Sequence, residues 1–299
     1  MEKVALHSPI ASSGSPETWQ ERLKFAPHSL LAVHLATLIG VILTGWSWKG
    51  LLLAVCIYFI RMIMVTAGYH RYFAHRSFST SRLFQFLLAL GAQSGAEKGV
   101  LWWASHHRWH HKYSDTEKDV HSAKLRGFAF AHVGWLFSKR WSATDPTLIP
   151  DLTKYPELRL LDREGIQAIP IVAVALVCLF LGGIHGLLWG FGVSSIMLWH
   201  GSFAINSFAH LVGRQRYVTS DESRNSWILA ILTTGEGWHN NHHHFPSSAR
   251  QGFFWWEFDL TYYVLRGLEL LGLVWDLRPV PEHLLAGPLI ADQLASSHG

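Results

Sequence analysis

The stretch that decides the fold is "GLLLAVCIYFIRMIMVTAGY", residues 50–69, which runs directly into "HRYFAH", residues 70–75. The first stretch is apolar and long enough to cross a hydrocarbon core, which needs about 20 residues of helix. One charge, Arg61, lies inside it, and such a charge usually faces the interior of a helix bundle. We therefore predict a membrane helix that carries two histidines, His70 and His75, to the point where it leaves the bilayer.

Three further apolar segments of similar length occur at residues 29–46, 166–184 and 187–208. Short connections join residues 29–46 to residues 50–69, and residues 166–184 to residues 187–208, which predicts two helical hairpins. The chain has 299 residues, of which 49% are hydrophobic and 15% charged. This composition is typical of an integral membrane protein. We expect an all-α fold with four transmembrane helices and a helical cap.

The basic residues predict the orientation of the chain. Of its 25 Lys and Arg, only Lys49 and Arg61 lie in the two predicted hairpins. Because basic segments mark the cytoplasmic side, we expect both termini and residues 71–165 in the cytoplasm, with the inner membrane as the location in a bacterium. No cleaved signal peptide is expected before the first span. The net charge of +4 needs no nucleic acid to explain it.

A further apolar stretch, "LFQFLLALGAQSGAEKGVLWW", covers residues 83–103. Glycines and one charged pair interrupt it, so we interpret it as an interfacial or re-entrant helix and not as a span. Trp102 and Trp103 would then lie at the level of the lipid headgroups. The two cysteines, Cys56 and Cys178, lie inside predicted spans, which excludes a cysteine-ligated zinc site. Any bound metal must have imidazole ligands.

The 20 histidines of the chain gather in short motifs on the predicted cytoplasmic side. Two motifs, "HHRWHH" (106–111) and "GEGWHNNHHHFP" (235–246), each contain a triple spaced i, i+3 and i+4, and such positions share one face of a helix. In "INSFAH", an asparagine lies one turn before a histidine, and in "HRYFAH" the spacing of five would suit two different metals. The candidates are His70, His75, His107, His110, His111, Asn206, His210, His239, His242 and His243.

These imidazoles are too many for one tetrahedral centre, so we predict two metals with four or five nitrogen ligands each. Four acids, Asp115, Glu117, Asp119 and Glu236, are candidates to hydrogen-bond the far ring nitrogens. For Asp115 and Glu117 a solvated acidic loop is an equal alternative. His106 and His244 break the triple pattern and are treated as extra residues. A lone histidine is more often a core residue than a ligand, so His34, His185 and His200 are assigned no role.

The order of the motifs resembles the membrane fatty acyl desaturases, in particular the Δ9 (stearoyl-CoA) type and its bacterial members. The matching stretches are "HRYFAH", then "HHRWHH" followed by "KYSDTEKDVHS" and "RGFAFAHVGW", then "NSFAH", "GEGWHNNHHHFP" and "LGLVWDLRPV". The similarity covers about residues 28–279, which predicts a desaturase domain there. Residues 1–27 would form a cytoplasmic arm and residues 280–299 a cytoplasmic tail.

The resemblance implies a di-iron centre held in the cytoplasmic cap, in which zinc can replace iron in purified protein. Asn206 would reach a metal through water, and Asp119 and His121 match residues that surround the ligands. Glu236 is a candidate for the same surrounding layer. The nine implied ligands are His70, His75, His107, His110, His111, His210, His239, His242 and His243.

The implied reaction is O₂-dependent formation of a cis double bond in a saturated acyl chain, at Δ9 and on acyl-CoA. A separate electron donor, of cytochrome b5 or ferredoxin type, is expected, because no fused redox segment is recognisable. Lys139 and Arg140 match residues that grip the CoA phosphates, whereas Ser105 replaces an arginine of the animal enzymes and no adenine-binding stretch is recognisable around Phe25. An acyl-lipid substrate therefore stays open.

Other functions remain as alternatives at this stage. A hydroxylase or decarboxylase would use the same histidine pattern, and a zinc protein that only shares the fold would keep it without turnover. A membrane metal transporter would place ligands inside its spans, whereas the motifs here lie outside them.

Overall fold

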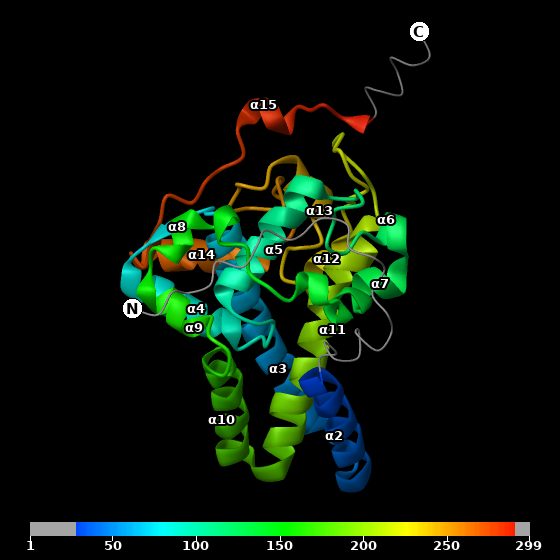
Figure 1. Cartoon of the computed structure of the whole chain (residues 1–299), viewed down its shortest axis with the longest axis vertical. Coiled ribbons are helices and arrows are strands. Elements are labelled where there is room, and N and C mark those ends of the chain that lie inside the picture. The colour runs from blue at the N-terminus through cyan, green and yellow to red at the C-terminus, as the bar shows by residue number, and fades with distance from the viewer. Residues whose placement is uncertain (1–27, 291–299) are drawn as a thin grey trace.

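A computed structural model describes residues 28–290. The predicted arm at residues 1–27 lies outside the described residues, as do residues 291–299 of the predicted tail. The described chain consists of a stalk of helices below a broader cap (Figure 1). The stalk helices are α2 (His28–Thr44), α3 (Trp48–Met64), α10 (Ile169–His185) and α11 (Ser194–Ser207).

Two hairpins make up the stalk. In the first, the Ser47 side chain caps α3 by accepting a hydrogen bond of 3.0 Å from the backbone N–H of Gly50. In the second, α10 leads directly into the π-helical segment η6 (Gly186–Val193), but Gly183, near the end of α10, has φ 56° and ψ −148°. Only glycine adopts this conformation readily. The chain reverses there, and α10 and α11 run side by side (Figure 1).

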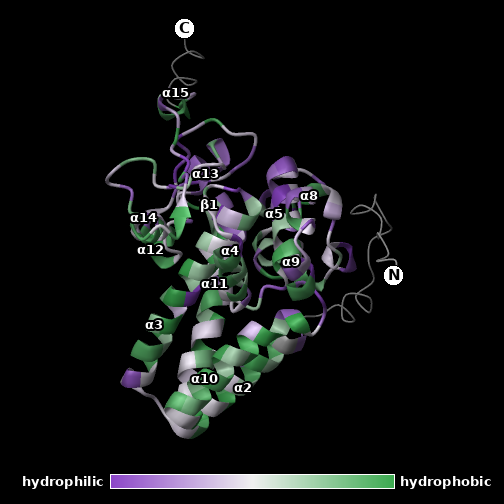
Figure 2. Ribbon diagram, turned by 90° about the vertical axis from the view of Figure 1, so that its left-hand side faces the viewer, coloured by the Kyte–Doolittle hydropathy of each residue, from purple (hydrophilic) through white to green (hydrophobic). Residues whose placement is uncertain are grey.

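The stalk has the surface of a membrane protein. Two described segments, Trp48–Ala74 and Ile166–His210, are long and apolar enough to cross a membrane, and Leu30–Thr44 is a shorter apolar helix. Large apolar side chains point outward, with Phe180 88% exposed and Leu43 80% exposed, and apolar residues dominate the stalk in Figure 2. Contiguous apolar surface of this kind fits lipid better than water. Four separate crossings stay a prediction.

Arg61, the charge inside the second predicted span, is only 3% exposed. Its guanidinium donates to the backbone carbonyl of Ser94, at 2.6 and 3.2 Å, and to the hydroxyls of Ser194 (3.1 Å) and Ser195 (2.8 Å). A buried charge without such acceptors would be very costly. The predicted spans contain no acid to pair with it, and the structure supplies neutral oxygens from two other parts of the chain instead.

The cap is built from short helices and turns around the upper ends of α3 and α11. The π-helical segment η1 (Val65–Ala74) continues α3 into it. Two-residue strands, β1 (Ser79–Thr80) and β2 (Val274–Trp275), pair antiparallel. The cap helices are α4 (Arg82–Gln93), α5 (Val100–Tyr113), α6 (Ala123–Arg126), α7 (Phe128–His132), α8 (Pro150–Thr153), α9 (Pro156–Leu161), α12 (Trp227–Leu232), α13 (His239–His244), α14 (Leu260–Leu270) and α15 (Glu282–Leu285).

Single 3₁₀ turns connect these helices. They are η2 (Gly134–Phe137), η3 (Lys139–Trp141), η4 (Pro146–Leu148), η5 (Ile166–Ala168) and η7 (Phe208–His210). One buried cluster joins η1, α4, α5, α9 and α11 and includes Phe73, Leu88, Val100, Leu158 and Leu198. This core fixes the cap on the stalk, so that the histidine motifs of η1, α5, η7 and α13 have defined positions.

The prediction of one helix over residues 83–103 is wrong, whereas the interfacial or re-entrant position of this stretch stays a prediction. Two helices, α4 and α5, replace the single helix. Between them, Ala96 (φ 59°) and Lys98 (φ 65°) adopt the left-handed conformation, and a right-handed helix cannot continue through such residues. Trp102 is packed inside the protein, and its expected position at the level of the headgroups stays a prediction. It is 6% exposed and its indole N–H donates to the backbone carbonyl of Trp141 at 3.0 Å.

Candidate metal centre

The structure brings together all nine histidines that were expected to bind metal. They form two groups, and within each group the ligand atoms lie within 4.8 Å of one another. The five-histidine group contains His70, His75, His107, His111 and His242. The four-histidine group contains His110, His210, His239 and His243.

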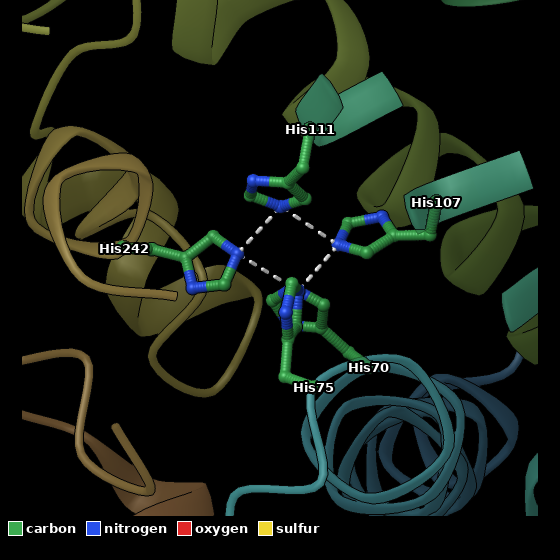
Figure 3. Close-up of side chains that lie close together, drawn as sticks. All are labelled: His70, His75, His107, His111 and His242. Carbon is green, nitrogen blue, oxygen red and sulfur yellow. Dashed lines mark hydrogen bonds between the residues drawn. The ribbon is translucent and has the colours of Figure 1, made fainter. Parts of the chain in front are cut away.

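The five-histidine group is a ring of imidazoles that converge from three elements, η1, α5 and α13 (Figure 3). The Nε2 atom of His107 lies 2.8 Å from that of His75 and 3.0 Å from that of His111. The Nε2 atom of His242 lies 2.9 Å from that of His111 and 3.0 Å from that of His70. Five ring nitrogens therefore face one small volume.

The four-histidine group lies beside it. The Nε2 atoms of His210 and His239 are 3.1 Å apart. The Nε2 atoms of His110 and His243 are buried and have no hydrogen-bond partner within residues 28–290. A buried polar atom without a partner is costly, unless something outside the protein fills its position. Both nitrogens are aimed into the same group, where a metal ion would satisfy them.

Each histidine triple is divided between the two groups. His107 and His111 join the five-histidine group, whereas His110 joins the other. In the second triple, His242 joins the five-histidine group and its two neighbours do not. On a helix with 3.6 residues per turn, residues i and i+4 point about 40° apart, and residue i+3 points about 60° to the other side. The i, i+4 pair therefore serves one metal position, and the i+3 residue serves the other.

The expectation that His70 and His75 serve two different metals is wrong, because both lie in the five-histidine group. The reason is the π-helical backbone of η1, in which His75 N–H donates to the His70 carbonyl at 3.1 Å. A π-helix has i→i+5 hydrogen bonds, so residues five apart lie above one another. Their ring centroids are 4.8 Å apart.

Three carboxylates support the four-histidine group from behind. Asp119 accepts from Nδ1 of His110 at 2.8 Å, Asp115 from Nδ1 of His210 at 3.1 Å, and Asp221 from Nδ1 of His243 at 2.6 Å. These carboxyl groups are 0–4% exposed. Such bonds fix the ring tautomer, point Nε2 at the metal and make the ligand more basic.

In the five-histidine group, only His70 pairs with a carboxylate among the described residues. Its partner, Glu236, also accepts from Arg71 at 3.1 Å, and Arg71 in turn pairs with Asp259 at 2.9 Å. Arg71 is 1% exposed and compensates the negative charge of Glu236. The carboxylate behind this group is therefore part of a buried network that also fixes the end of η1.

For most of the ligands whose pKa is shifted, the electrostatics favour neutral imidazole, which is the form that binds metal. His110 is the exception, because burial lowers its pKa but the adjacent Asp119 outweighs this and raises it. Burial, followed by repulsion from neighbouring imidazoles, holds the pKa of His107, His111 and His242 well below its usual range. Burial lowers the pKa of His243 to about 4, although Asp221 opposes the shift. Burial also opposes ionisation of Asp221, but the adjacent His243 holds the pKa of that carboxyl far below its usual range.

The residues of both groups fit a metal ion by this donor set. Converging Nε2 atoms, unpartnered buried nitrogens and carboxylates on the opposite ring nitrogens are the three features of a histidine-ligated site. Aromatic rings make the five-histidine group rigid as well. The Trp103 indole stacks on His107 with centroids 4.7 Å apart and on Tyr69 with centroids 5.3 Å apart, and its N–H donates to Glu97 at 3.0 Å.

The remaining predicted residues have varied positions. His121 lies beside His110, with ring centroids 4.3 Å apart, and its backbone N–H donates to Asp119. Asn206 is half-buried on α11 and has no hydrogen bond to either group in the part of the chain that is described. Lys139 and Arg140 lie in η3 and belong to neither group, and the Arg140 guanidinium lies over the Trp141 ring, 4.5 Å from its centroid.

The extra histidines are used elsewhere. His106 stacks on Trp102 and its Nδ1 lies 2.8 Å from the Trp102 carbonyl, while Nε2 of His244 lies 3.0 Å from the Leu284 carbonyl. Of the two uncertain acids, Glu117 is exposed and Asp115 is a histidine partner.

Sequence reasoning missed Asp221, Arg71, Trp103 and Glu97. The only available signal for Asp221 was an acid in a polar loop, which is too common to be informative.

Comparisons with known proteins agree with this geometry. A sequence profile described as fatty acid desaturase matches residues 46–275. The sn-1 stearoyl-lipid 9-desaturase of Anabaena variabilis is 35% identical over 272 residues, which is 90% of this chain and 97% of that protein. The acyl-CoA 5-desaturase of Anemone leveillei is 38% identical over 237 residues, 78% of this chain and 73% of the relative.

A third relative, the chloroplastic palmitoyl-monogalactosyldiacylglycerol delta-7 desaturase of Arabidopsis thaliana, is 34% identical over 253 residues, 83% of this chain and 67% of that protein. The extent of these matches, together with the two histidine groups, shows that the chain belongs to the fatty acid desaturase family.

Proposed function

We propose that this protein is a di-iron, O₂-dependent desaturase that introduces a cis double bond at Δ9 of a saturated fatty acyl chain. The observation that carries the proposal is the convergence of nine imidazoles in two groups. Family membership supports desaturation, and the relatives act at different positions, so Δ9 is the finer part of the proposal. The expected balance is one CH₂–CH₂ unit, O₂, two electrons and two protons giving CH=CH and two water molecules.

The five-histidine group and the four-histidine group would each hold one iron. When bound, the irons supply the oxygen chemistry that removes hydrogen from an unactivated methylene, which no amino-acid side chain achieves. The protein residues hold the imidazoles in place. Asp119, Asp115 and Asp221 orient three rings through Nδ1, and the buried surroundings keep water from the reacting atoms.

The stalk supports the proposal that the enzyme spans the membrane four times with its cap in the cytoplasm. The exposed apolar surface of both hairpins is consistent with this arrangement, and so is the concentration of basic residues outside the hairpins. Such a placement would let an acyl chain reach the centre from the bilayer. A separate electron donor would dock on the cap, and the chemistry requires two electrons per turnover.

The substrate head group is the part on which the relatives differ. CoA is the expected carrier, with Lys139 and Arg140 as its phosphate contacts. A membrane lipid is the second candidate, because the sn-1 stearoyl-lipid 9-desaturase relative matches 90% of the chain. Ser105, which replaces an arginine expected near CoA, is fully buried, and its hydroxyl accepts from the Asp145 backbone N–H at 3.0 Å.

The test is expression in a host that lacks its own desaturase, followed by fatty-acid profiling. The wild-type protein should yield new cis monoenes with the double bond at C9, and His110→Ala should yield none. Oxygenated products or products that lack one carbon would instead indicate a hydroxylase or a decarboxylase. Iron-loaded protein that stays inactive with a matched reductase would overturn the enzyme function altogether.

A second assay separates the two head groups. Purified enzyme is given stearoyl-CoA or a stearoyl phospholipid, with the same reductase. A CoA enzyme should turn over the first substrate, and the double variant Lys139→Ala, Arg140→Ala should raise its KM while leaving turnover at saturation unchanged. Turnover of the phospholipid alone would favour the lipid and would refute the assignment of those two residues.

A further inference from the structure

A third cluster of histidines lies outside both metal groups, where α2, α7 and α11 meet. It is a chain of close polar contacts from His34 through His200 and His132 to Ser207. The Nε2 atoms of His34 and His200 are 3.2 Å apart, Nδ1 of His200 lies 2.9 Å from Nε2 of His132, and Nδ1 of His132 lies 2.9 Å from the Ser207 hydroxyl. None of these residues has a role in the proposed reaction.

Backbone carbonyls end the chain on both sides. Nδ1 of His34 lies 2.8 Å from the Leu30 carbonyl, and the Ser207 hydroxyl donates to the Phe203 carbonyl at 3.0 Å. A carbonyl only accepts, so each end requires a proton from the side chain. Starting from these ends, His34 uses its single proton at Nδ1. The Ser207 oxygen must accept from His132, and His132 must accept from His200.

The four neutral groups therefore carry four protons for five contacts. With both ends satisfied, the contact without a proton is the one between the Nε2 atoms of His34 and His200, and it is also the longest of the five. Two nitrogen lone pairs then face each other at 3.2 Å. This arrangement is repulsive unless a cation lies between them.

We propose that His34 and His200 bind one divalent transition-metal ion of the zinc type, separate from the two large histidine groups. With metal–nitrogen bonds of about 2.1 Å, two ligands of a tetrahedral ion lie about 3.4 Å apart and two ligands of a linear ion about 4.2 Å apart. The observed separation of 3.2 Å fits the tetrahedral ion. For comparison, the neighbouring pairs of Nε2 atoms in the five-histidine group, which is a candidate metal position itself, are 2.8–3.0 Å apart.

The surroundings complete the site. The partners of both Nδ1 atoms orient the rings in the way that carboxylates do in the four-histidine group, because a ligand histidine almost always donates its other N–H. The Trp199 ring stacks on His34 with centroids 5.7 Å apart. His200 is exposed where α11 meets His132 of the cap helix α7, so an ion can enter from the cap side, and two positions are left for water or an anion. The ion would join α2, the first helix of the stalk, to α11.

The test is metal counting on tag-free, iron-loaded protein in detergent, equilibrated with micromolar Zn²⁺ and then desalted. The wild type should retain one ion more per chain than His34→Ala or His200→Ala, whichever metals fill the two large groups. His28→Ala, an exposed histidine on the same helix, is the matched control and should retain the wild-type number. His132→Phe should weaken binding by about tenfold, because it removes the partner of His200.

A thermal measurement adds a second result that distinguishes binding from misfolding. Zn²⁺ should raise the unfolding temperature of the wild type and of His28→Ala, and should have no such effect on His34→Ala with its full iron content. The proposal is overturned if wild type and His34→Ala retain the same number of ions. It is equally overturned if zinc binds only as iron is lost, because the zinc would then occupy the two large groups. The contact between His34 and His200 would in that case hold an extra proton and no metal.

Discussion

The five-histidine group and the four-histidine group hold their imidazoles in different ways. The first has more nitrogens and one carboxylate partner, Glu236, whose charge Arg71 compensates. The second has one nitrogen fewer and three carboxylates, which together bring three negative charges close to the metal position. The five-histidine group thus has one more ligand, whereas the four-histidine group has more negative charge around it. The metal in the four-histidine group should therefore depend strongly on acids that do not touch it.

The largest expected effect comes from removing one ligand, and it should differ between the two groups. His239→Ala leaves three nitrogens in the four-histidine group. The metal of this group should therefore be lost, and product formation should fall by at least about 100-fold. His75→Ala leaves four nitrogens, so its metal should be retained. Metal counting and fatty-acid profiling of both variants measure this. Equal metal loss in the two variants would break the comparison.

Metal removal comes next. A chelator at neutral pH should remove the two ions in separate phases, with the ion of the five-histidine group leaving first, because the carboxylates behind the other group hold its cation more strongly. Stopped-flow measurement with a chromogenic chelator would resolve the phases. Asp221→Asn should accelerate only the slow phase. Acceleration of the fast phase would reverse the assignment.

Neutralising an acid behind the four-histidine group should have a moderate effect. Asp221→Asn keeps the shape of the side chain and removes the charge, and should weaken metal binding there by about 10–100-fold. Glu117→Gln is a matched control, because Glu117 is an exposed acid that lies between Asp115 and Asp119 in the sequence. Metal titration of the apo-proteins measures both. An unaltered affinity in Asp221→Asn would show that the charge has no influence on the metal.

Glu236→Gln should act more on folding than on metal. It removes the charge of one partner of Arg71, which is 1% exposed, and among the described residues leaves the buried guanidinium with Asp259 as its one charged partner, beside the neutral Ala249 carbonyl. The free energy of unfolding should fall by about 3 kcal/mol. Denaturant unfolding of the apo-protein, with Asp221→Asn as the comparison, measures this. A larger loss in Asp221→Asn would contradict the difference between the two groups.

The smallest effect is expected for the histidines outside the groups. His106→Gln should retain both metals and wild-type product levels, because the His106 ring contacts Trp102 and no metal group includes it. The same assays apply. Loss of either metal in this variant would show that the boundary of the centre is drawn too narrowly.

Much of the fold could be predicted from local sequence. The apolar segments correspond to α2, α3, α10 and η6–α11 within a few residues, because hydrophobicity and helix length are properties of adjacent residues. The prediction of a single helix over residues 83–103 was wrong for a local reason as well. The left-handed backbone at Ala96 and Lys98 has no clear signal in the sequence, because neither residue is a glycine.

The sequence by itself determined which histidines come together, because two i, i+3, i+4 triples and their order along the chain are visible in it. Only the tertiary structure decided how they divide. The helical geometry of α5 and α13 separates each triple, and the π-helix at residues 65–74 places His70 and His75 on one metal position.

The partners of distant residues were equally invisible in the sequence. His243 meets Asp221, Arg61 meets Ser194, and His34 meets His200, and each pair is formed by segments that the fold brings together. Helix periodicity acts over a few residues, whereas burial of a shared core sets contacts across more than a hundred. This physical difference separates what the sequence determines from what only folding decides.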